Sequence, residues 1–457
     1  MRPVSLSELT GWADGALIQG SPNTIVSNLV TDSRKVADGD VFLAIKGERF
    51  DAHDFLEDVS NRNPAAVIVS NLTAATEKFT GAVIHVRDTL KSLQAIALQH
   101  RRASGNLRVI GITGSNGKTS TKDFIGAVLS AGGNVNRTAG NLNNHFGLPL
   151  TILSGTAEDR FGVWEMGMNH PGEIEVLAEI ASPDAAVITN IGTAHIENMG
   201  TREAIASEKS EIAMAVRKGG YCVMPVADDF YGFVKERISD HCDLVGVGIG
   251  EGDVRAGNVK MSGNGKAGFD LIHSSGDSAS VILPVSGKHM VLNSLLAAAV
   301  GLKEGIPLAR IASALSTAEL TGGRLQERKA GGFSFLDDSY NANPDSMRAA
   351  LETLRDTDVK GRRVAVLGFM GELGEHADPE HLALGKRVFE TGVDALITVS
   401  DKAELIHEGA EGLLVREHFS SHSEAAGFLR DFLTPDDLVL VKGSRAAAME
   451  NVIGELN

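Results

Sequence analysis

The feature that most constrains the fold of this chain is an apolar run that leads into a glycine-rich turn and then into Lys-Thr. Residues 109–120 read VIGITGSNGKTS, and apolar residues recur at helical spacing just after them. A strand, a glycine-rich loop and a helix in this order are typical of a phosphate-binding loop in a parallel sheet. Gly114 and Gly117 let backbone N–H groups converge on an anion, while Lys118 and Thr119 are placed for the outer phosphates and Mg²⁺. The chain is therefore expected to bind a nucleotide.

The loop is a variant of the usual pattern, which has four residues between the first glycine and Gly-Lys-Thr. Here Gly114 leaves two residues and Gly111 leaves five. The alternative is an ordinary glycine-rich turn between a strand and a helix, which Lys118 and Thr119 disfavour. The loop predicts a nucleotide, but it does not predict what is done with it.

Other parts of the chain indicate two more domains. At about 150 residues per domain, 457 residues predict roughly three domains. A polar stretch at 101–106 precedes the first strand-like run, and a turn at 321–324 precedes a second set of strands between helices. Glycine-rich alternating segments at 242–285 predict β-hairpins attached to the middle domain. We expect an α/β protein of three domains: an N-terminal domain at 1–105, a central P-loop parallel-sheet ATPase domain at 106–322, and a Rossmann-like C-terminal domain at 323–457.

Composition excludes several classes of partner and environment. The net charge is −16 and no block of basic residues is present, so a nucleic-acid partner is not expected. Cys222 and Cys242 are too few for a disulfide framework and lack metal-ligand spacing, as in proteins of a reducing compartment. No apolar run of signal-peptide or membrane-spanning type is seen. We expect a cytoplasmic protein without a membrane span.

Two candidate metal ligands follow strand-like runs. Glu165 comes directly after Val163 and Trp164, and His195 comes shortly after an apolar run at 185–191. Ligands of α/β sheets bind at the carboxyl ends of strands, where a carboxylate suits magnesium. A lone histidine is more often structural or merely exposed, so for His195 both interpretations stay open.

Lys209 interrupts an apolar stripe. In the expected helix at 203–218, Ile205 and Ile212 lie four residues before and three residues after it. A buried ammonium is costly, so this lysine should bind an anion, shift its pKa or be modified, for instance by carbamylation. The alternative is that its aliphatic stem extends to water.

Two turns in the C-terminal domain follow strand-like runs: one is rich in Asp and Asn, and the other is rich in glycine. Residues 336–345 read LDDSYNANPD, which is typical of a turn with a helix cap at Asn343 or Asp345, yet their place at a strand end favours a ligand role. Residues 368–374 have the spacing G-x-x-G-x-x-G, which is not the dinucleotide fingerprint. A nicotinamide cofactor is therefore not expected.

Taken together, these motifs resemble those of the Mur ligase family of peptidoglycan synthesis from end to end. The phosphate-binding loop matches the family's ATP loop, including its unusual spacing, and Glu165, His195 and Lys209 match its metal ligands and its carbamylated lysine. The segments that resemble the family's uridine-diphosphate-binding and sugar-peptide-binding parts are 31–34, 42–47, 50–55 and 140–144.

The resemblance implies a role for each matching residue. The implied catalytic residues are Lys118, His195 and Lys209. The implied ATP contacts are Gly114, Ser115, Asn116, Gly117, Lys118, Thr119, Ser120, Asn293, Arg324 and Asp338. The implied ligands of two Mg²⁺ ions are Thr119, Glu165, His195 and carbamylated Lys209. The implied substrate contacts are Ser33, Arg34, Gly47, Asp51, His53, Asn141, Asn143, Asn144, Tyr340, Asn341 and Asn343.

Within the family, residues 165–174 and 340–344 resemble members that add a dipeptide, and the Asp-Asn-Pro-Arg run of diaminopimelate-adding members is absent. The resemblance implies an ATP-dependent amide ligase, acting as a monomer, that adds D-alanyl-D-alanine to UDP-N-acetylmuramoyl-tripeptide through an acyl phosphate. Its product would serve cell-wall synthesis, cell shape and division. Two residues depart from the pattern, Phe369 where Asp is frequent and Ala52 where Gly is usual. No role is assigned to Phe369.

Three alternatives remain to be weighed. Another Mur-type or folylpolyglutamate-type amino-acid ligase shares the ATP loop, but the folylpolyglutamate type lacks the uridine-binding domain that Ser33, Arg34 and Gly47 indicate. A nucleotide-dependent switch ATPase would show an acidic strand-end box and a partner surface. In an inactive sugar-nucleotide sensor, a complete set of catalytic residues would have no function.

Overall fold

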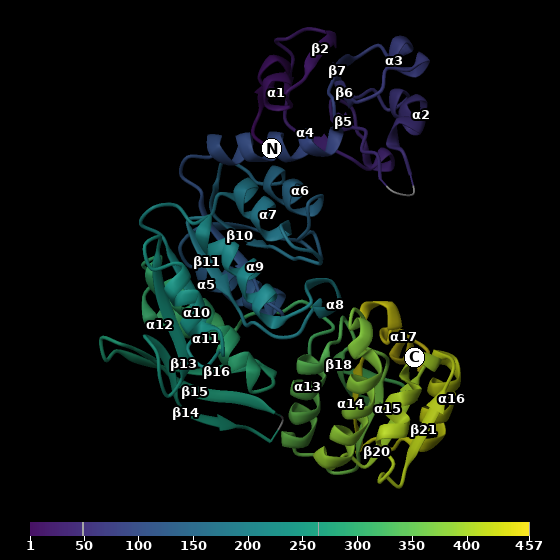
Figure 1. Cartoon of the computed structure of the whole chain (residues 1–457). Helices are drawn as coiled ribbons and strands as arrows, with labels where there is room; N and C mark the ends of the chain where they lie inside the picture. Colours follow the sequence, from purple (N-terminus) through teal and green to yellow (C-terminus); the bar gives the residue numbers. More distant parts are fainter. Residues whose placement is uncertain (48–49, 264, 457) are drawn as a thin grey trace.

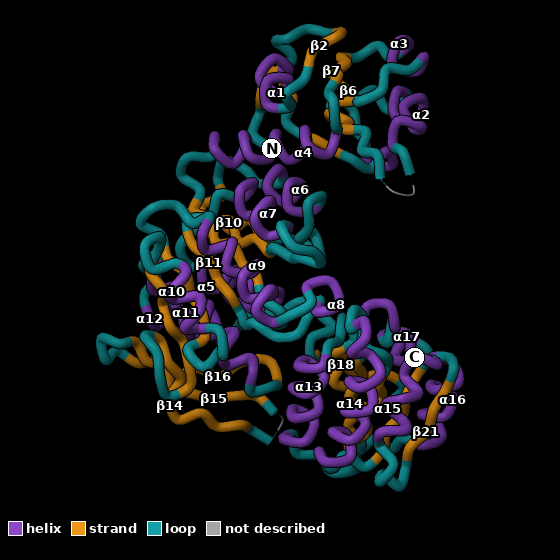
Figure 2. The backbone as a smooth tube through the Cα atoms, viewed as in Figure 1, coloured by secondary structure: helices purple, strands orange, loops and turns teal. Residues whose placement is uncertain are grey.

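The computed structural model describes residues 1–47, 50–263 and 265–456. Three main sheets follow one another along the chain, with five, nine and six strands (Figure 1). Helices flank the strands of the middle and C-terminal parts (Figure 2). The predicted α/β class is confirmed. Among the described residues, no helix combines the length and the apolar character needed to span a membrane.

The N-terminal part is built on a five-stranded sheet of order β2-β7-β6-β5-β4, parallel except for the β2–β7 pair. Every residue of its strand β6 is buried, as expected for a parallel strand covered on both faces. The strands are β1 (Val4–Ser5), β2 (Ala16–Gln19), β3 (Ile25–Val26), β4 (Leu29–Val30), β5 (Val41–Leu43), β6 (Ala66–Val69) and β7 (Ala82–His85). The helices are α1 (Leu6–Trp12), the 3₁₀ turns η1 (Ser33–Lys35) and η2 (Ala52–Phe55), α2 (Leu56–Ser60), α3 (Ala74–Lys78) and α4 (Thr89–Ala103).

The middle part carries the nine-stranded sheet, of order β16-β15-β14-β13-β12-β11-β8-β10-β9. Its strands are β8 (Arg108–Thr113), β9 (Asn134–Arg137), β10 (Asp159–Glu165), β11 (Ala185–Ile188), β12 (Tyr221–Pro225), β13 (Asp243–Ile249), β14 (Val254–Met261), β15 (Lys266–His273) and β16 (Ser278–Ser286). Its helices are α5 (Lys118–Leu129), α6 (Gly147–Leu153), α7 (Glu173–Ala181), α8 (Ile196–Met199), α9 (Arg202–Met214), α10 (Tyr231–Arg237), α11 (His289–Lys303) and α12 (Leu308–Ser316).

Alternate residues of the central strand β8 enter two different cores. Ile110 and Ile112 pack with α5, α11 and α12, whereas Val109 packs with α7 and α9 on the opposite face. The strands from β9 to β14 are parallel, and β14, β15 and β16 form the antiparallel hairpins predicted for this region. Because β8 lies between β10 and β11, its carboxyl end is the switch point at which such sheets bind ligands.

The C-terminal part has a six-stranded sheet of order β17-β18-β22-β19-β20-β21, parallel apart from the β17–β18 pair. Its strands are β17 (Gln326–Ala330), β18 (Phe333–Asp338), β19 (Arg363–Leu367), β20 (Ala395–Val399), β21 (Arg416–Phe419) and β22 (Leu438–Lys442). Its helices are α13 (Pro344–Asp356), η3 (Gly374–His376), α14 (Ala377–Thr391), η4 (Asp401–Ala403), α15 (Glu404–Gly409), α16 (His422–Phe432), η5 (Arg445–Ala447) and α17 (Glu450–Gly454). One face packs on α13, α14 and α15, and the other on α16 and α17.

The C-terminal part also contacts the middle part at the hairpin of β14 and β15, which lies far in the sequence from the end of β8. The backbone N–H of Asp358, just after α13, donates to the carbonyl of Gly263, at the end of the β14 hairpin, over 2.7 Å. Figure 1 shows the β14–β15 hairpin reaching α13. The hairpin therefore forms a second connection between the two parts.

Helix α4 joins the N-terminal part to the middle part through buried polar side chains. Arg101 is 1% exposed and donates to the carbonyls of Ala181 and Ser182 and to the carboxylate of Asp184, the last over 2.9 Å. Separation of this pair would leave a buried charge without its partner, which is energetically costly. The pair therefore holds α4 in one position on the middle sheet.

His100, on the same helix, lowers the free energy of unfolding as the pH becomes acidic. Its ring is buried and its Nε2 accepts the backbone N–H of Arg2 over 3.0 Å, which requires the neutral ring. Burial lowers the pKa of His100 from 6.5 to about 4. The unfolded chain therefore binds this proton first as the pH falls below 6.5, and by pH 5 the native state loses about 2 kcal/mol.

We expect His100→Gln to reduce the fall in melting temperature between pH 7.5 and pH 5.0, because glutamine keeps an acceptor for the Arg2 N–H but does not titrate. Thermal unfolding of both proteins at the two pH values measures the effect. An equal fall in both proteins would show that His100 does not cause the acid sensitivity.

Candidate active site

The phosphate-binding loop is held in place by the strand next to it. Gly117, in the left-handed region at φ 78°, precedes α5, and Gly114 has φ 149°. A Cβ on Gly114 would lie 1.8 Å from Oγ1 of Thr189, just beyond β11. Thr189 in turn donates to the carbonyl of Asn116 over 2.5 Å. Glycine at 114 is thus required by the close approach of the neighbouring strand.

Asn190 accepts hydrogen bonds from two backbone N–H groups of the loop that was predicted to bind an anion. Its carbonyl accepts the N–H of Ser115 and its Oδ1 accepts the N–H of Asn116, each over 3.0 Å. The N–H groups of the first turn of α5 are the ones that the helix leaves for a phosphate. Asn190 was missed because it follows β11 and reaches the loop only across the sheet.

Lys118, the first residue of α5, turns back over the loop. Its Nζ donates to the carbonyl of Gly114 over 2.6 Å. Burial lowers the pKa of Lys118, and the carboxylate of Glu165 acts in the opposite direction. Asn293 on α11 lies on the other side, where a Cβ on Gly117 would come within 2.7 Å of its Oδ1. Ser120 is buried in the first turn of α5.

Thr119 and Glu165 form a pair of oxygen donors beside the loop. Oγ1 of Thr119 donates to Oε2 of Glu165 over 3.1 Å, and Oε1 of Glu165 is buried without a hydrogen bond to the described residues. Nζ of Lys122 lies 3.4 Å from that oxygen, and Arg324 donates to Oγ1 of Thr119 over 2.8 Å. A carboxylate oxygen without a hydrogen bond beside a hydroxyl fits Mg²⁺, which prefers hard oxygen ligands.

Lys122 is a site residue that the sequence analysis missed. It lies one turn after Lys118 in α5, is 3% exposed, and also donates to the carbonyl of Thr138 over 3.0 Å. Lys122 lies close to apolar residues of the helix that follows the phosphate-binding loop. This pattern could have indicated a buried lysine, as the apolar stripe did for Lys209.

Lys209 is buried as its pattern predicts, at 1% exposure between the buried Ile205 and Ile212 of α9. Its stem does not extend to water. No hydrogen bond or ion pair joins its ammonium to the residues that the structure describes. Burial, followed by the positive charge of Lys118, lowers the pKa of Lys209 well below its ordinary value. A lysine in this setting favours the neutral amine.

His195 precedes α8 with a left-handed backbone, at φ 64°. Its Nδ1 lies 2.6 Å from Oε2 of Glu372, a residue of the C-terminal part. Mg²⁺ does not favour nitrogen, so His195 by itself does not make a site for a second ion, which needs oxygen ligands as well.

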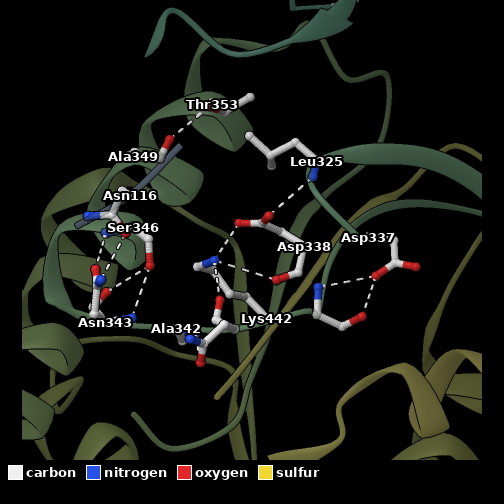
Figure 3. A network of polar contacts seen from close by, with 12 residues as sticks. Asn116, Leu325, Asp337, Asp338, Ala342, Asn343, Ser346, Ala349, Thr353 and Lys442 are labelled. Atoms are coloured by element: carbon white, nitrogen blue, oxygen red, sulfur yellow. Dashed lines mark hydrogen bonds and ion pairs between the residues drawn. The ribbon is translucent and has the colours of Figure 1, made fainter. Parts of the chain in front are cut away.

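The amide-rich turn after β18 caps a helix, as one of its two predicted roles requires, and also contacts the phosphate-binding loop. Asn343 caps α13 by accepting the N–H of Ser346 over 2.9 Å, and its Nδ2 donates to Oδ1 of Asn116 in the phosphate-binding loop over 2.8 Å (Figure 3). Asp345 lies 3.3 Å from the N–H of Thr193, near His195. This turn therefore connects the C-terminal part to the phosphate-binding loop.

Asp338 lies in a polar network at the start of the C-terminal part (Figure 3). Its carboxylate accepts from Nζ of the buried Lys442 over 2.5 Å and from the N–H of Leu325 over 3.2 Å. Lys442 also donates to the carbonyl of Asn341. Tyr340 lies under the guanidinium of Arg324, 4.3 Å from ring centre to Cζ. These contacts position Arg324 toward Thr119.

The remaining predicted substrate contacts form two groups, one in the N-terminal part and one in the middle part. In the N-terminal part, Ser33, Arg34 and Gly47 line a cavity of about 910 Å³ between η1 and η2. Asp51 and His53 do not line it: Nδ1 of His53 is 2.5 Å from Asp51, and its Nε2 accepts the N–H of Ser70.

In the middle part, the asparagine-rich segment packs beside the strand end that carries Glu165. Asn143 accepts the N–H of Gly167 at its carbonyl over 2.9 Å, and its own N–H donates to the carbonyl of Asn141. Oδ1 of Asn144 accepts the N–H of Gly147, the first residue of α6, over 2.9 Å. Of the two departures from the family pattern, Ala52 lines the cavity and Phe369 packs into the C-terminal core.

Comparison with known proteins places this geometry in a family. Residues 112–301 match the model of the Mur ligase middle domain, and residues 323–445 match that of the Mur ligase, glutamate ligase domain. The UDP-N-acetylmuramoyl-tripeptide–D-alanyl-D-alanine ligase of Bacillus subtilis is 36% identical over 95% of this chain and 93% of its own.

Solved structures agree with the sequence relatives. MurF from Acinetobacter baumannii superposes with a TM-score of 0.92 at 35% identity, covering 100% of this chain and 99% of its own. The MurF ligase of Thermotoga maritima, solved in complex with ADP, has a TM-score of 0.83 at 28% identity, covering 94% and 97%. With relatives of this identity along nearly its whole length, the chain belongs to the Mur ligase family.

Proposed function

We propose that this Mur ligase uses ATP to join D-alanyl-D-alanine to UDP-N-acetylmuramoyl-tripeptide. The observation that carries the proposal is the Thr119–Glu165 oxygen pair beside the phosphate-binding loop that Lys118 covers, together with the buried amine of Lys209, whose pKa the charge of Lys118 lowers. The activity for which the relatives are named supports the choice of substrates.

In the proposed reaction, a carboxylate oxygen of the tripeptide attacks the γ-phosphorus of ATP, and the bond to the bridging oxygen of ADP breaks. The amine nitrogen of the dipeptide then attacks the carbonyl carbon of the acyl phosphate. The amide bond forms, phosphate leaves with the bonding electron pair, and the amine loses its proton. No side-chain nucleophile is needed.

The first step brings a carboxylate against a polyanion, so the site must offset their repulsion. Lys118 contributes a cation at the phosphates, and Arg324, next to Thr119, brings a second one from the C-terminal part. Thr119 and Glu165 would hold one Mg²⁺ ion, and His195 with modified Lys209 a second. Bound there, Mg²⁺ supplies charge neutralisation and in-line alignment of the reacting groups.

Carbamylation of Lys209 is part of the proposal. The lowered pKa of Lys209 leaves a neutral amine, which is the form that attacks CO₂. The new N–C bond yields a carbamate with the loss of one proton, so a neutral amine becomes an anionic oxygen ligand. The absence of a competing ion pair among the described residues keeps the amine available.

The remaining assignments follow from the same reaction. The cavity at Ser33, Arg34 and Gly47 is proposed to take the uridine-diphosphate end of the substrate, and the asparagines at 141–144 its sugar-peptide end. Tyr340 and Asn341 are proposed to contact substrate or nucleotide from the C-terminal part. We propose domains at 1–105, 106–322 and 323–457, a monomer, and a cytoplasmic location, where the free thiols Cys222 and Cys242 would stay reduced.

The proposal is tested by phosphate release from ATP by the purified protein with UDP-N-acetylmuramoyl-tripeptide and one of three supplements: D-alanyl-D-alanine, single amino acids or none. We expect release with the dipeptide only. Release with a single amino acid would assign the chain to another amino-acid-adding Mur ligase. Release that is independent of any acceptor would indicate a switch ATPase.

A further inference from the structure

The loop that follows β19 reaches from the C-terminal part into the metal end of the site. This loop, at 368–373, is the glycine-rich segment that does not fit a dinucleotide fingerprint. Within it, Glu372 places Oε2 at 2.6 Å from Nδ1 of His195. The two residues are far apart in sequence, and each comes from a different sheet.

The loop is fixed on its own side by a second histidine. Nε2 of His381 accepts the N–H of Met370 over 2.9 Å, and Nδ1 of His381 donates to the carbonyl of Ala377 over 2.6 Å. The following turn, η3, packs on α8, where a Cβ on Gly374 would lie 3.0 Å from Cγ of Glu197. Glu372 is therefore held between an anchored loop and the helix that His195 begins.

Both partners of the contact have unusual backbones. His195 has φ 64° and Glu372 has φ 60°, in a region that residues with side chains rarely adopt. Strain of this kind persists where the surrounding structure enforces it, and it gathers at functional sites. Two such residues that face each other across a domain boundary indicate a contact that is maintained for its function.

The two ring nitrogens of His195 have different surroundings. Its buried Nδ1 lies 2.6 Å from Oε2 of Glu372, although the angle falls outside hydrogen-bond geometry. No hydrogen bond occupies Nε2 among the residues that the structure describes. Histidines that bind metals usually donate their second N–H to a carboxylate or carbonyl, which sets the tautomer and orients the ring.

We propose that Glu372 is a positioning residue that accepts Nδ1–H of His195 and so presents Nε2 to the metal. This inference rests on the proposed function, because His195 is a metal ligand only within it. Since Glu372 belongs to the C-terminal part, the metal end of the site reaches its full affinity only when that part is docked on α8. Docking of the C-terminal part and metal binding then favour each other.

The test is Mn²⁺ binding to the full chain with a non-hydrolysable ATP analogue, followed by the EPR signal of free Mn²⁺. We expect Glu372→Gln to weaken one Mn²⁺ site by about tenfold or more and to leave the other unchanged. Glu375→Gln removes the same charge three residues further on and is the matched control. The melting temperature of Glu372→Gln should stay at the wild-type value because its side chain is 52% exposed.

A double variant separates positioning from direct ligation. If Glu372 acts through His195, Glu372→Gln added to His195→Asn causes no further loss of Mn²⁺ affinity. A further loss in the double variant, or wild-type Mn²⁺ binding in Glu372→Gln, would overturn the inference. Neither outcome bears on the dipeptide requirement of phosphate release, so failure of the inference is distinguishable from failure of the proposed function.

Discussion

Replacement of Lys209 by alanine is expected to lower dipeptide-dependent phosphate release by on the order of 10³-fold. The variant loses the amine that is proposed to become a carbamate, and with it several kcal/mol of charge stabilisation in the transfer of the phosphoryl group. Its fold should persist, because alanine at a buried helix position removes a costly amine that has no partner among the described residues. Steady-state release of phosphate at saturating substrates measures the effect.

Bicarbonate distinguishes a carbamate from a plain cationic role. Wild-type protein purified at low pH should regain activity when bicarbonate is added, whereas Lys209→Ala should not. Protein incubated with ¹³C-bicarbonate should show a carbamate carbon signal that is missing from Lys209→Ala. The matched control is Lys218→Ala, which removes an exposed lysine just beyond α9. Full activity in Lys209→Ala would remove the carbamate from the mechanism.

Lys118→Met is expected to reduce the same activity by about 10²- to 10³-fold, mostly in kcat. Methionine fills a similar volume but cannot balance the charge that develops as the carboxylate meets the γ-phosphorus. The same change removes the hydrogen bond to the carbonyl of Gly114, so the melting temperature must be measured in parallel.

The control for Lys118→Met is Lys235→Met, an exposed lysine on α10 in the same part of the chain. Comparable losses of activity in both variants would mean that the activity depends on the net charge of the protein and not on the position of Lys118. If kcat stays unchanged and only the KM for ATP rises, Lys118 would bind ATP equally in the ground state and the transition state, and would not be catalytic.

The part of the candidate site that could be predicted consists of residues whose signal lies within one short segment of the sequence. The phosphate-binding loop is contiguous in sequence, and Lys209 is conspicuous on its own helix because burial of an ammonium is costly. Glu165 ends β10 and His195 lies beyond β11, so the rule that ligands bind at the carboxyl ends of strands selected both as candidates, with a structural role of His195 left open.

The missed residues act across the sheet or across the domain boundary. Thr189 and Asn190 support the phosphate-binding loop from a strand about 70 residues later in the chain, and no periodicity shows which loop a strand end will face. Glu372 meets His195 only because two separate sheets are docked. The substrate contacts of the N-terminal and middle parts, by contrast, came from family resemblance alone, which could not separate cavity-lining Arg34 from the internally bonded His53.

The backbone hydrogen bond between Asp358 and Gly263 limits how the C-terminal part can move. The connecting segment near Arg324 holds that part at one place, and the tip of the β14 hairpin holds it at another. A rigid body attached at two separated points keeps only rotation about the line through them. The hairpin contact therefore restricts any movement of the C-terminal part relative to the middle part to rotation about the line through these two points.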